Sequence, residues 1–124
     1  MKLTPVLFVS AIEPCLKFWV DQVGFQKTAE VPEGSKLGFV ILGKEGAEVM
    51  LQTYESADKD APALAPEFRK CLTFLYVEVS NVDEVAKKLK SVEIVMPMRK
   101  TFYGMKEFSV REPGGHIVCF AARE

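Results

Sequence analysis

The sequence predicts an α+β fold made of two βαβββ modules, and three observations lead to this prediction. Two segments with a similar strand-like pattern, Val6–Ser10 and Tyr76–Ser80, start about 70 residues apart. A second matching pair, Phe39–Leu42 and Phe108–Arg111, has nearly the same separation. In both halves a helical spacing of apolar residues follows the first segment, and a glycine-containing turn and another strand follow the second. Duplication of one structural unit explains all three observations.

The first module is predicted from the two periodicities of its apolar residues. Glu13–Val23 has helical spacing, Pro14 is tolerated in the first helical turn, and Gly24 ends the helix. Segments rich in β-branched and aromatic residues predict four strands: Leu3–Val9, Phe25–Val31, Leu37–Leu42 and Glu48–Tyr54. The first module therefore covers about residues 1–54.

The second module repeats the order of the first and covers about residues 71–124. Asn81 is placed to cap a helix over Val82–Leu89. The predicted strands are Thr73–Ser80, Val92–Pro97, Glu107–Arg111 and His116–Ala122, with a loop over Met98–Lys106. The polar segment Glu55–Lys70 is the expected linker, with room for a short helix. Because each module alone is small, we expect a single domain over residues 1–124.

Composition narrows the class of protein. Apolar residues make up 48% of the chain and charged residues 27%, which is typical of a globular domain. The net charge of −1 favours neither nucleic acid nor a membrane surface as a partner, and no apolar run is long enough to span a bilayer. Three cysteines without metal-ligand spacing indicate reduced thiols, so the expected location is the cytoplasm.

Three segments in order, Val9–Phe25, Val77–Leu89 and Gly104–Phe120, resemble the vicinal-oxygen-chelate superfamily of glyoxalases, bleomycin-resistance proteins and extradiol dioxygenases. The last segment is the most specific, because an acidic residue, a proline and glycines form its turn. The resemblance implies that the two modules form a cup-shaped mixed sheet with helices outside. It also implies a site in the cup and a homodimer.

In metal-dependent members of that superfamily, ligands come from the start of each module's first strand and from its last strand. The resemblance places these positions at Thr4, Met50, Phe74 and Cys119. None is a histidine or a carboxylate, the usual ligands of a catalytic divalent metal, so we expect neither a metal nor another cofactor. The alternative is a hard cation held by Glu48, Gln52 and Glu78.

Strand alternation predicts which side chains line the cup. The expected ligand-binding residues are Phe8, Met50, Gln52, Phe74, Tyr76 and Cys119 on the strands, and Phe102, Tyr103 and Lys106 in the loop at the mouth. Such an aromatic and apolar lining suits a planar or amphipathic molecule, while Lys106 or Arg99 suits an anionic group on it. The alternative is that Phe8, Phe74 and Tyr76 fill the cup as core, which is favoured for each one taken separately, whereas the group together favours binding. Alternate positions, such as Leu51 and Val118, should pack under the helices.

These observations favour a metal-independent small-molecule-binding protein of the bleomycin-resistance type over an enzyme. The first alternative is a metal-dependent, glyoxalase-like or dioxygenase-like enzyme with an atypical ligand set. The second is a dimerisation or regulatory module. Cys119 is read either as a nucleophile or as an inert buried thiol, and His116 as a residue that stabilises the last turn rather than a catalyst.

Overall fold

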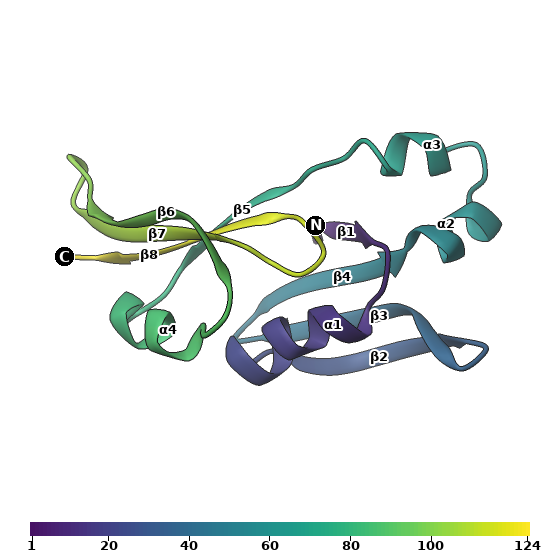
Figure 1. Ribbon diagram of the computed structural model, residues 1–124, viewed down its shortest axis with the longest axis horizontal. Helices are drawn as coiled ribbons and strands as arrows, with labels where there is room; N and C mark the ends of the chain where they lie inside the picture. The colour runs from purple at the N-terminus through teal and green to yellow at the C-terminus, as the bar shows by residue number, and fades with distance from the viewer. The chain divides into compact units, whose positions relative to one another are not determined.

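The computed structural model describes residues 1–124 and divides into two compact units, Met1–Cys71 and Leu72–Glu124 (Figure 1). Each unit contains one four-stranded mixed sheet and a helix between its first and second strands. The predicted pair of βαβββ modules is therefore confirmed. No helix in either unit is long and apolar enough to cross a membrane.

In the first unit the strand order is β1-β4-β3-β2, with β1 parallel to β4 and the other pairs antiparallel. The elements are β1 (Val6–Val9), α1 (Glu13–Leu16), η1 (Lys17–Gln22), β2 (Gln26–Glu33), β3 (Lys36–Lys44), β4 (Ala47–Thr53), α2 (Tyr54–Asp60) and α3 (Ala65–Phe68).

The second unit has the same topology, with strand order β5-β8-β7-β6 and β5 parallel to β8. Its elements are β5 (Phe74–Glu78), α4 (Val82–Lys88), β6 (Glu93–Lys100), β7 (Met105–Arg111) and β8 (Ile117–Arg123). The registers correspond as well: Val6 faces Met50 in the first unit, and Tyr76 faces Cys119 in the second. The repeat in the sequence is thus a repeat of strand pairing.

The predicted helix over Glu13–Val23 is confirmed, but only its first turn is an α-helix. It continues as the wider π-helical η1, closed by a hydrogen bond of 2.9 Å from the Val23 amide to the Phe18 carbonyl. Trp19 is buried on this helix and packs edge-on against Phe18 and Phe25. Trp19 is therefore a core residue of the first unit.

Strand alternation separates the two faces of the second sheet as expected. Phe108, Val110, Val118 and Phe120 are buried on one face, and the rings of Phe108 and Phe120 are stacked. Helix α4 starts at the predicted cap, because the Asn81 side chain accepts a hydrogen bond from the Glu84 amide. Figure 1 shows α1 and α4 each lying against the sheet of its own unit.

Two predicted boundaries are wrong. The first strand begins at Val6 rather than Leu3, whose side chain is exposed. The predicted loop Met98–Lys106 is mostly strand, because β6 continues to Lys100 and β7 begins at Met105. Pro97 cannot donate a hydrogen bond to a neighbouring strand and so favours a strand end in the sequence, but Arg99 and Lys100 beyond it still pair with β7.

The segment expected to be a linker folds as part of the first unit. The Thr53 side chain caps α2 by accepting a hydrogen bond from the Ser56 amide. Arg69, just after α3, makes two hydrogen bonds of 2.6 and 2.7 Å with Asp58 of α2. The two short helices are therefore joined to each other by a bidentate ion pair.

Gly24 gives a test of how the first helix ends. Its φ of +95° is unfavourable for residues with a side chain, and an added Cβ would lie 3.0 Å from the Nζ of Lys44, which donates to the Val23 carbonyl. We expect Gly24→Ala to lower the free energy of unfolding by about 1–2 kcal/mol in urea denaturation. Gly43→Ala is the matched control, because its Cβ would meet nothing closer than 3.7 Å. Equal stability of the two variants would contradict this account of the helix end.

Candidate ligand-binding site

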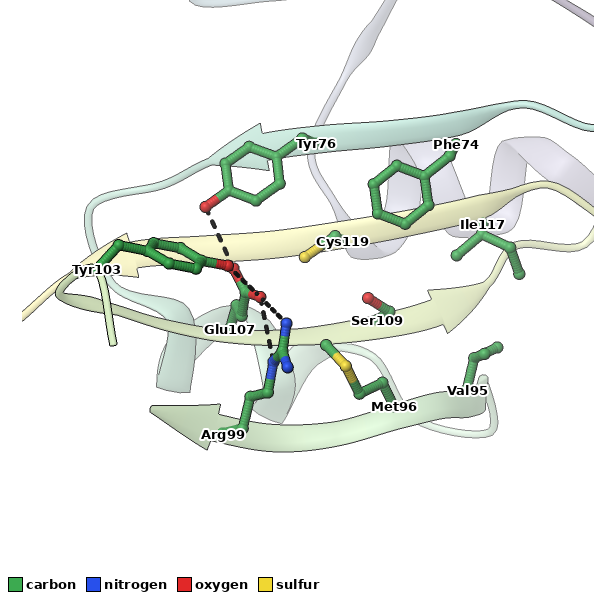
Figure 2. Close-up of a pocket in the computed structure, with 10 residues that line it drawn as sticks. All are labelled: Phe74, Tyr76, Val95, Met96, Arg99, Tyr103, Glu107, Ser109, Ile117 and Cys119. Carbon is green, nitrogen blue, oxygen red and sulfur yellow. Dashed lines mark hydrogen bonds and ion pairs between the residues drawn. The ribbon is translucent and has the colours of Figure 1, made fainter. Parts of the chain in front are cut away.

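The face of the second sheet that α4 leaves open carries a pocket of about 460 Å³ (Figure 2). Four strands contribute to it, because alternate residues of paired strands point to the same side. One row across the sheet runs Tyr76, Cys119, Ser109 and Met96. The complete lining is Phe74, Tyr76, Val95, Met96, Arg99, Tyr103, Glu107, Ser109, Ile117 and Cys119.

An irregularity in the edge strand brings Arg99 into this pocket. Met96 pairs with Ser109, and Arg99 pairs with Glu107, so three residues of β6 span two residues of β7. Such a register shift changes the face to which the following side chain points. Met96 and Arg99 therefore lie on the same face, although regular alternation would separate them.

The pocket has an apolar end and a polar end. Phe74, Val95 and Ile117 lie at one end in Figure 2, and Arg99, Tyr103 and Glu107 lie at the other. Phe74 and Tyr76 are 61% and 50% exposed, which is unusual for large aromatic side chains on a strand. The pocket is therefore amphipathic and has uncovered aromatic walls.

The Glu107 carboxylate organises the polar end. It is only 2% exposed and accepts hydrogen bonds from three side chains on different elements. Oε2 accepts from the Tyr76 hydroxyl at 3.2 Å, whereas Oε1 accepts from the Tyr103 hydroxyl at 3.0 Å and from Arg99 Nη2 at 2.8 Å and Nε at 3.3 Å. A buried charge is tolerated when it is paired and hydrogen-bonded in this way.

These contacts change how the groups titrate. Burial raises the pKa of Glu107, but the hydrogen bonds from Arg99, Tyr103 and Tyr76 outweigh it, so the pKa lies below its ordinary value. Burial, with the hydrogen bond to Glu107, raises the pKa of Tyr76. The hydrogen bond to Glu107 raises the pKa of Arg99. At neutral pH the polar end therefore holds one carboxylate, one guanidinium and a protonated Tyr76.

The Cys119 thiol lies at the floor of the pocket and is 2% exposed. Burial raises its pKa, and a hydrogen bond with the Ser109 side chain only partly opposes this. A thiol is a poor nucleophile because the thiolate is the reactive form. The environment of Cys119 therefore suits a packing role better than catalysis.

Comparison with known proteins identifies the family. The model of the Glyoxalase/Bleomycin resistance protein/Dioxygenase superfamily matches residues 3–120. The chain belongs to this superfamily. A search of curated proteins found no significant match.

Several solved structures share the fold. TioX from Micromonospora sp. ML1 has a TM-score of 0.78 and 20% identity over 100% of this chain and 99% of its own. The bleomycin-binding protein of bleomycin-producing Streptomyces verticillus, complexed with copper(II)-bleomycin, has a TM-score of 0.64 and 22% identity over 100% and 97%. TnmS3, an antibiotic binding protein from Streptomyces sp. CB03234, has a TM-score of 0.67 and 19% identity over 100% and 98%. At these identities the similarity establishes the fold alone.

The metal-ligand positions implied by the superfamily do not suit a divalent metal here. Thr4 donates its hydroxyl to Glu48, Met50 offers only a thioether, and Phe74 has no donor atom. Of the alternative set, Glu48 accepts hydrogen bonds from Lys2 and Thr4, and Gln52 donates to the Ser56 hydroxyl. No cluster of three or more His, Cys, Asp or Glu side chains could hold a metal ion.

Four of the residues expected from the sequence to bind a ligand line the pocket together: Phe74, Tyr76, Tyr103 and Cys119. Two neighbours in the expected mouth loop do not. Phe102 is 99% exposed and contacts the edge of the Tyr103 ring. Lys106 lies on the helix-facing side of β7, where its Nζ is 3.0 and 3.1 Å from the two Asp83 oxygens. Lys106 is not part of the pocket lining, because strand alternation at the start of β7 points it away from Glu107.

The other three expected residues belong to the first unit. Phe8 is buried, because its ring stacks on Phe68 of α3 with 3.9 Å between centroids. Met50 and Gln52 share one face of β4, and Gln52 Nε2 donates to the Ser56 hydroxyl at 3.1 Å. Within the first unit, Phe8 therefore packs against α3 in the way expected of a core residue.

His116 stabilises the turn region, as expected. Its Nδ1 accepts a hydrogen bond from the Thr73 amide at 3.0 Å, and its own amide donates to Glu112 at 2.9 Å. These contacts tie the start of β5 to the turn between β7 and β8.

Sequence reasoning missed Glu107 as a site residue. The sequence places it at the first position of the predicted strand Glu107–Arg111, next to a loop, where a carboxylate is normally solvated. Extending the strand alternation backwards from Ser109 would have placed Glu107 on the open face, beside Ala121 and one row from Cys119. The signal is therefore present in the predicted strand Glu107–Arg111 itself.

The lowered pKa of Glu107 predicts a pH dependence of stability. A carboxylate whose pKa is lower in the folded state than its unfolded value of about 4.5 stabilises the fold above that pH, and the contribution disappears as the pH falls through the folded value. We expect Glu107→Gln to be about 1 kcal/mol less stable than the wild type at pH 7. Below pH 4.5 the gap should narrow in urea denaturation. A constant gap from pH 7 to pH 3 would contradict the assignment.

Proposed function

We propose that the chain is a metal-independent binding protein of the bleomycin-resistance type, which holds an aromatic or amphipathic small molecule on the open face of the second sheet. The observation that carries the proposal is the pocket in which Phe74 and Tyr76 remain half exposed or more. An aromatic ligand would cover these rings and remove apolar surface from water. Stacking and edge contacts would add to this burial.

The chemistry of the pocket supports binding without turnover. Every hydrogen-bonding contact of the Glu107 carboxylate is made by a neighbouring side chain, so it is poorly placed to act as a base. The Cys119 thiol is buried with a raised pKa. Solved structures of the same fold include proteins described as bleomycin-binding and antibiotic-binding, which supports a natural product as the class of ligand.

A direct binding experiment tests the proposal. Purified protein is titrated by calorimetry with a panel of planar aromatic antibiotics and with bleomycin, each in the presence and absence of EDTA. We expect at least one compound to bind with the same affinity in both conditions and to be recovered unchanged. Trp19 fluorescence is a poor reporter, because Trp19 is buried and does not line the pocket. Binding that EDTA abolishes would favour the metal-dependent alternative.

Variants locate the bound molecule. Phe74→Ala and Tyr76→Ala should each weaken the affinity for such a compound about tenfold, because each removes an aromatic contact. Leu72→Ala is the matched control, since Leu72 is an exposed apolar residue of the same unit that does not line the pocket. Equal effects of all three variants would place the ligand elsewhere.

We also infer a homodimer, on the strength of the superfamily resemblance and of the apolar side chains that each chain leaves exposed. Sedimentation velocity of the purified protein measures this directly.

A further inference from the structure

We propose that the ligand of this pocket carries an anionic oxygen group, such as a carboxylate or sulfonate, beside its aromatic frame, and that Arg99 recognises this group. The inference rests on the proposed function and narrows its class of ligand. It follows from which hydrogen-bonding groups of the polar end are already used within the protein and which remain.

Glu107 fixes the orientation of Arg99. The guanidinium turns its Nε and Nη2 edge toward Glu107 Oε1, at 3.3 and 2.8 Å. A guanidinium is planar, so fixing one edge also fixes the direction of Nη1 and of the second Nη2 hydrogen. The Arg99 side chain remains 53% exposed and lines the pocket. Glu107 is therefore a positioning residue for a cation that keeps donors for a ligand.

The pocket offers a cationic ligand little unpaired negative charge. Its one carboxylate, Glu107, already accepts four hydrogen bonds from Tyr76, Tyr103 and Arg99. A ligand ammonium group at this end would meet the Arg99 cation, and the Glu107 charge is already paired with Arg99. Glu78 lies on the same face of β5 but does not line the pocket. The remaining lining is largely aromatic or aliphatic, so Arg99 is the charged donor left for recognition.

The geometry also predicts how the ligand lies. Its aromatic frame would rest against Phe74 and Ile117 at the apolar end, and its anionic group would reach toward Arg99 at the polar end (Figure 2). Charge-assisted hydrogen bonds are about twice as strong as neutral ones, so this contact would make the pocket selective for anionic over uncharged ligands.

Two fluorescent probes with the same rings test the inference. 8-Anilino-1-naphthalenesulfonate carries a sulfonate, and N-phenyl-1-naphthylamine is its uncharged parent. The measured quantity is the ratio of their dissociation constants. We expect Arg99→Gln to weaken binding of the sulfonate about tenfold and leave the affinity for the uncharged probe unchanged. Arg111→Gln is the matched control, because Arg111 pairs with Glu93 on the same sheet and does not line the pocket. It should leave the ratio unchanged.

A second measurement needs only the wild-type protein, in case Arg99→Gln does not fold. 2-Naphthoate and (2-naphthyl)methylammonium compete against bound N-phenyl-1-naphthylamine, and we expect the carboxylate to displace it at the lower concentration. Stronger displacement by the ammonium compound, or an unchanged probe ratio in folded Arg99→Gln, would overturn the role of Arg99. Neither result would contradict the proposed function. If neither fluorescent probe binds the wild type, the proposed function fails, and this inference fails with it.

Discussion

The buried carboxylate of Glu107 is the constraint on which the candidate site depends. A carboxylate that is 2% exposed must be neutralised and hydrogen-bonded, and here the partners come from β5, β6 and the turn between β6 and β7. Satisfying one charge therefore fixes three side chains at the same end of the pocket. The site is preorganised because the alternative is an unpaired buried charge.

This cluster belongs to a module whose architecture is simple. A first strand that pairs in parallel with the last strand, together with three antiparallel strands, leaves one sheet face for the helix and the other open. In the second unit the open face carries exposed aromatic rings around the pocket. In the first unit Phe68 of α3 stacks on Phe8 of the equivalent strand, so part of the corresponding face is covered. Two copies of one fold have thus acquired different surfaces.

The sequence predicts the orientation of those site residues whose side chains follow regular strand alternation. Phe74, Tyr76 and Cys119 lie on strands whose alternation is regular, so their common face followed from the sequence. Arg99 was considered only as a loop cation, because the register shift after Met96 that brings it to the pocket has no simple sequence signal. Lys106 was expected at the mouth of the pocket because the sequence places it in a loop, whereas it lies on β7 and alternates there with Glu107.

The sequence by itself determined the two modules, their superfamily and the absence of suitable metal ligands at the implied positions, because these depend on residue identity and short-range spacing. The tertiary structure decided which charges are paired. Glu107 with Arg99, and Lys106 with Asp83, are contacts between separate elements, and their partners depend on strand register and helix placement. Electrostatic recognition is set by distances between such elements, which no local pattern encodes.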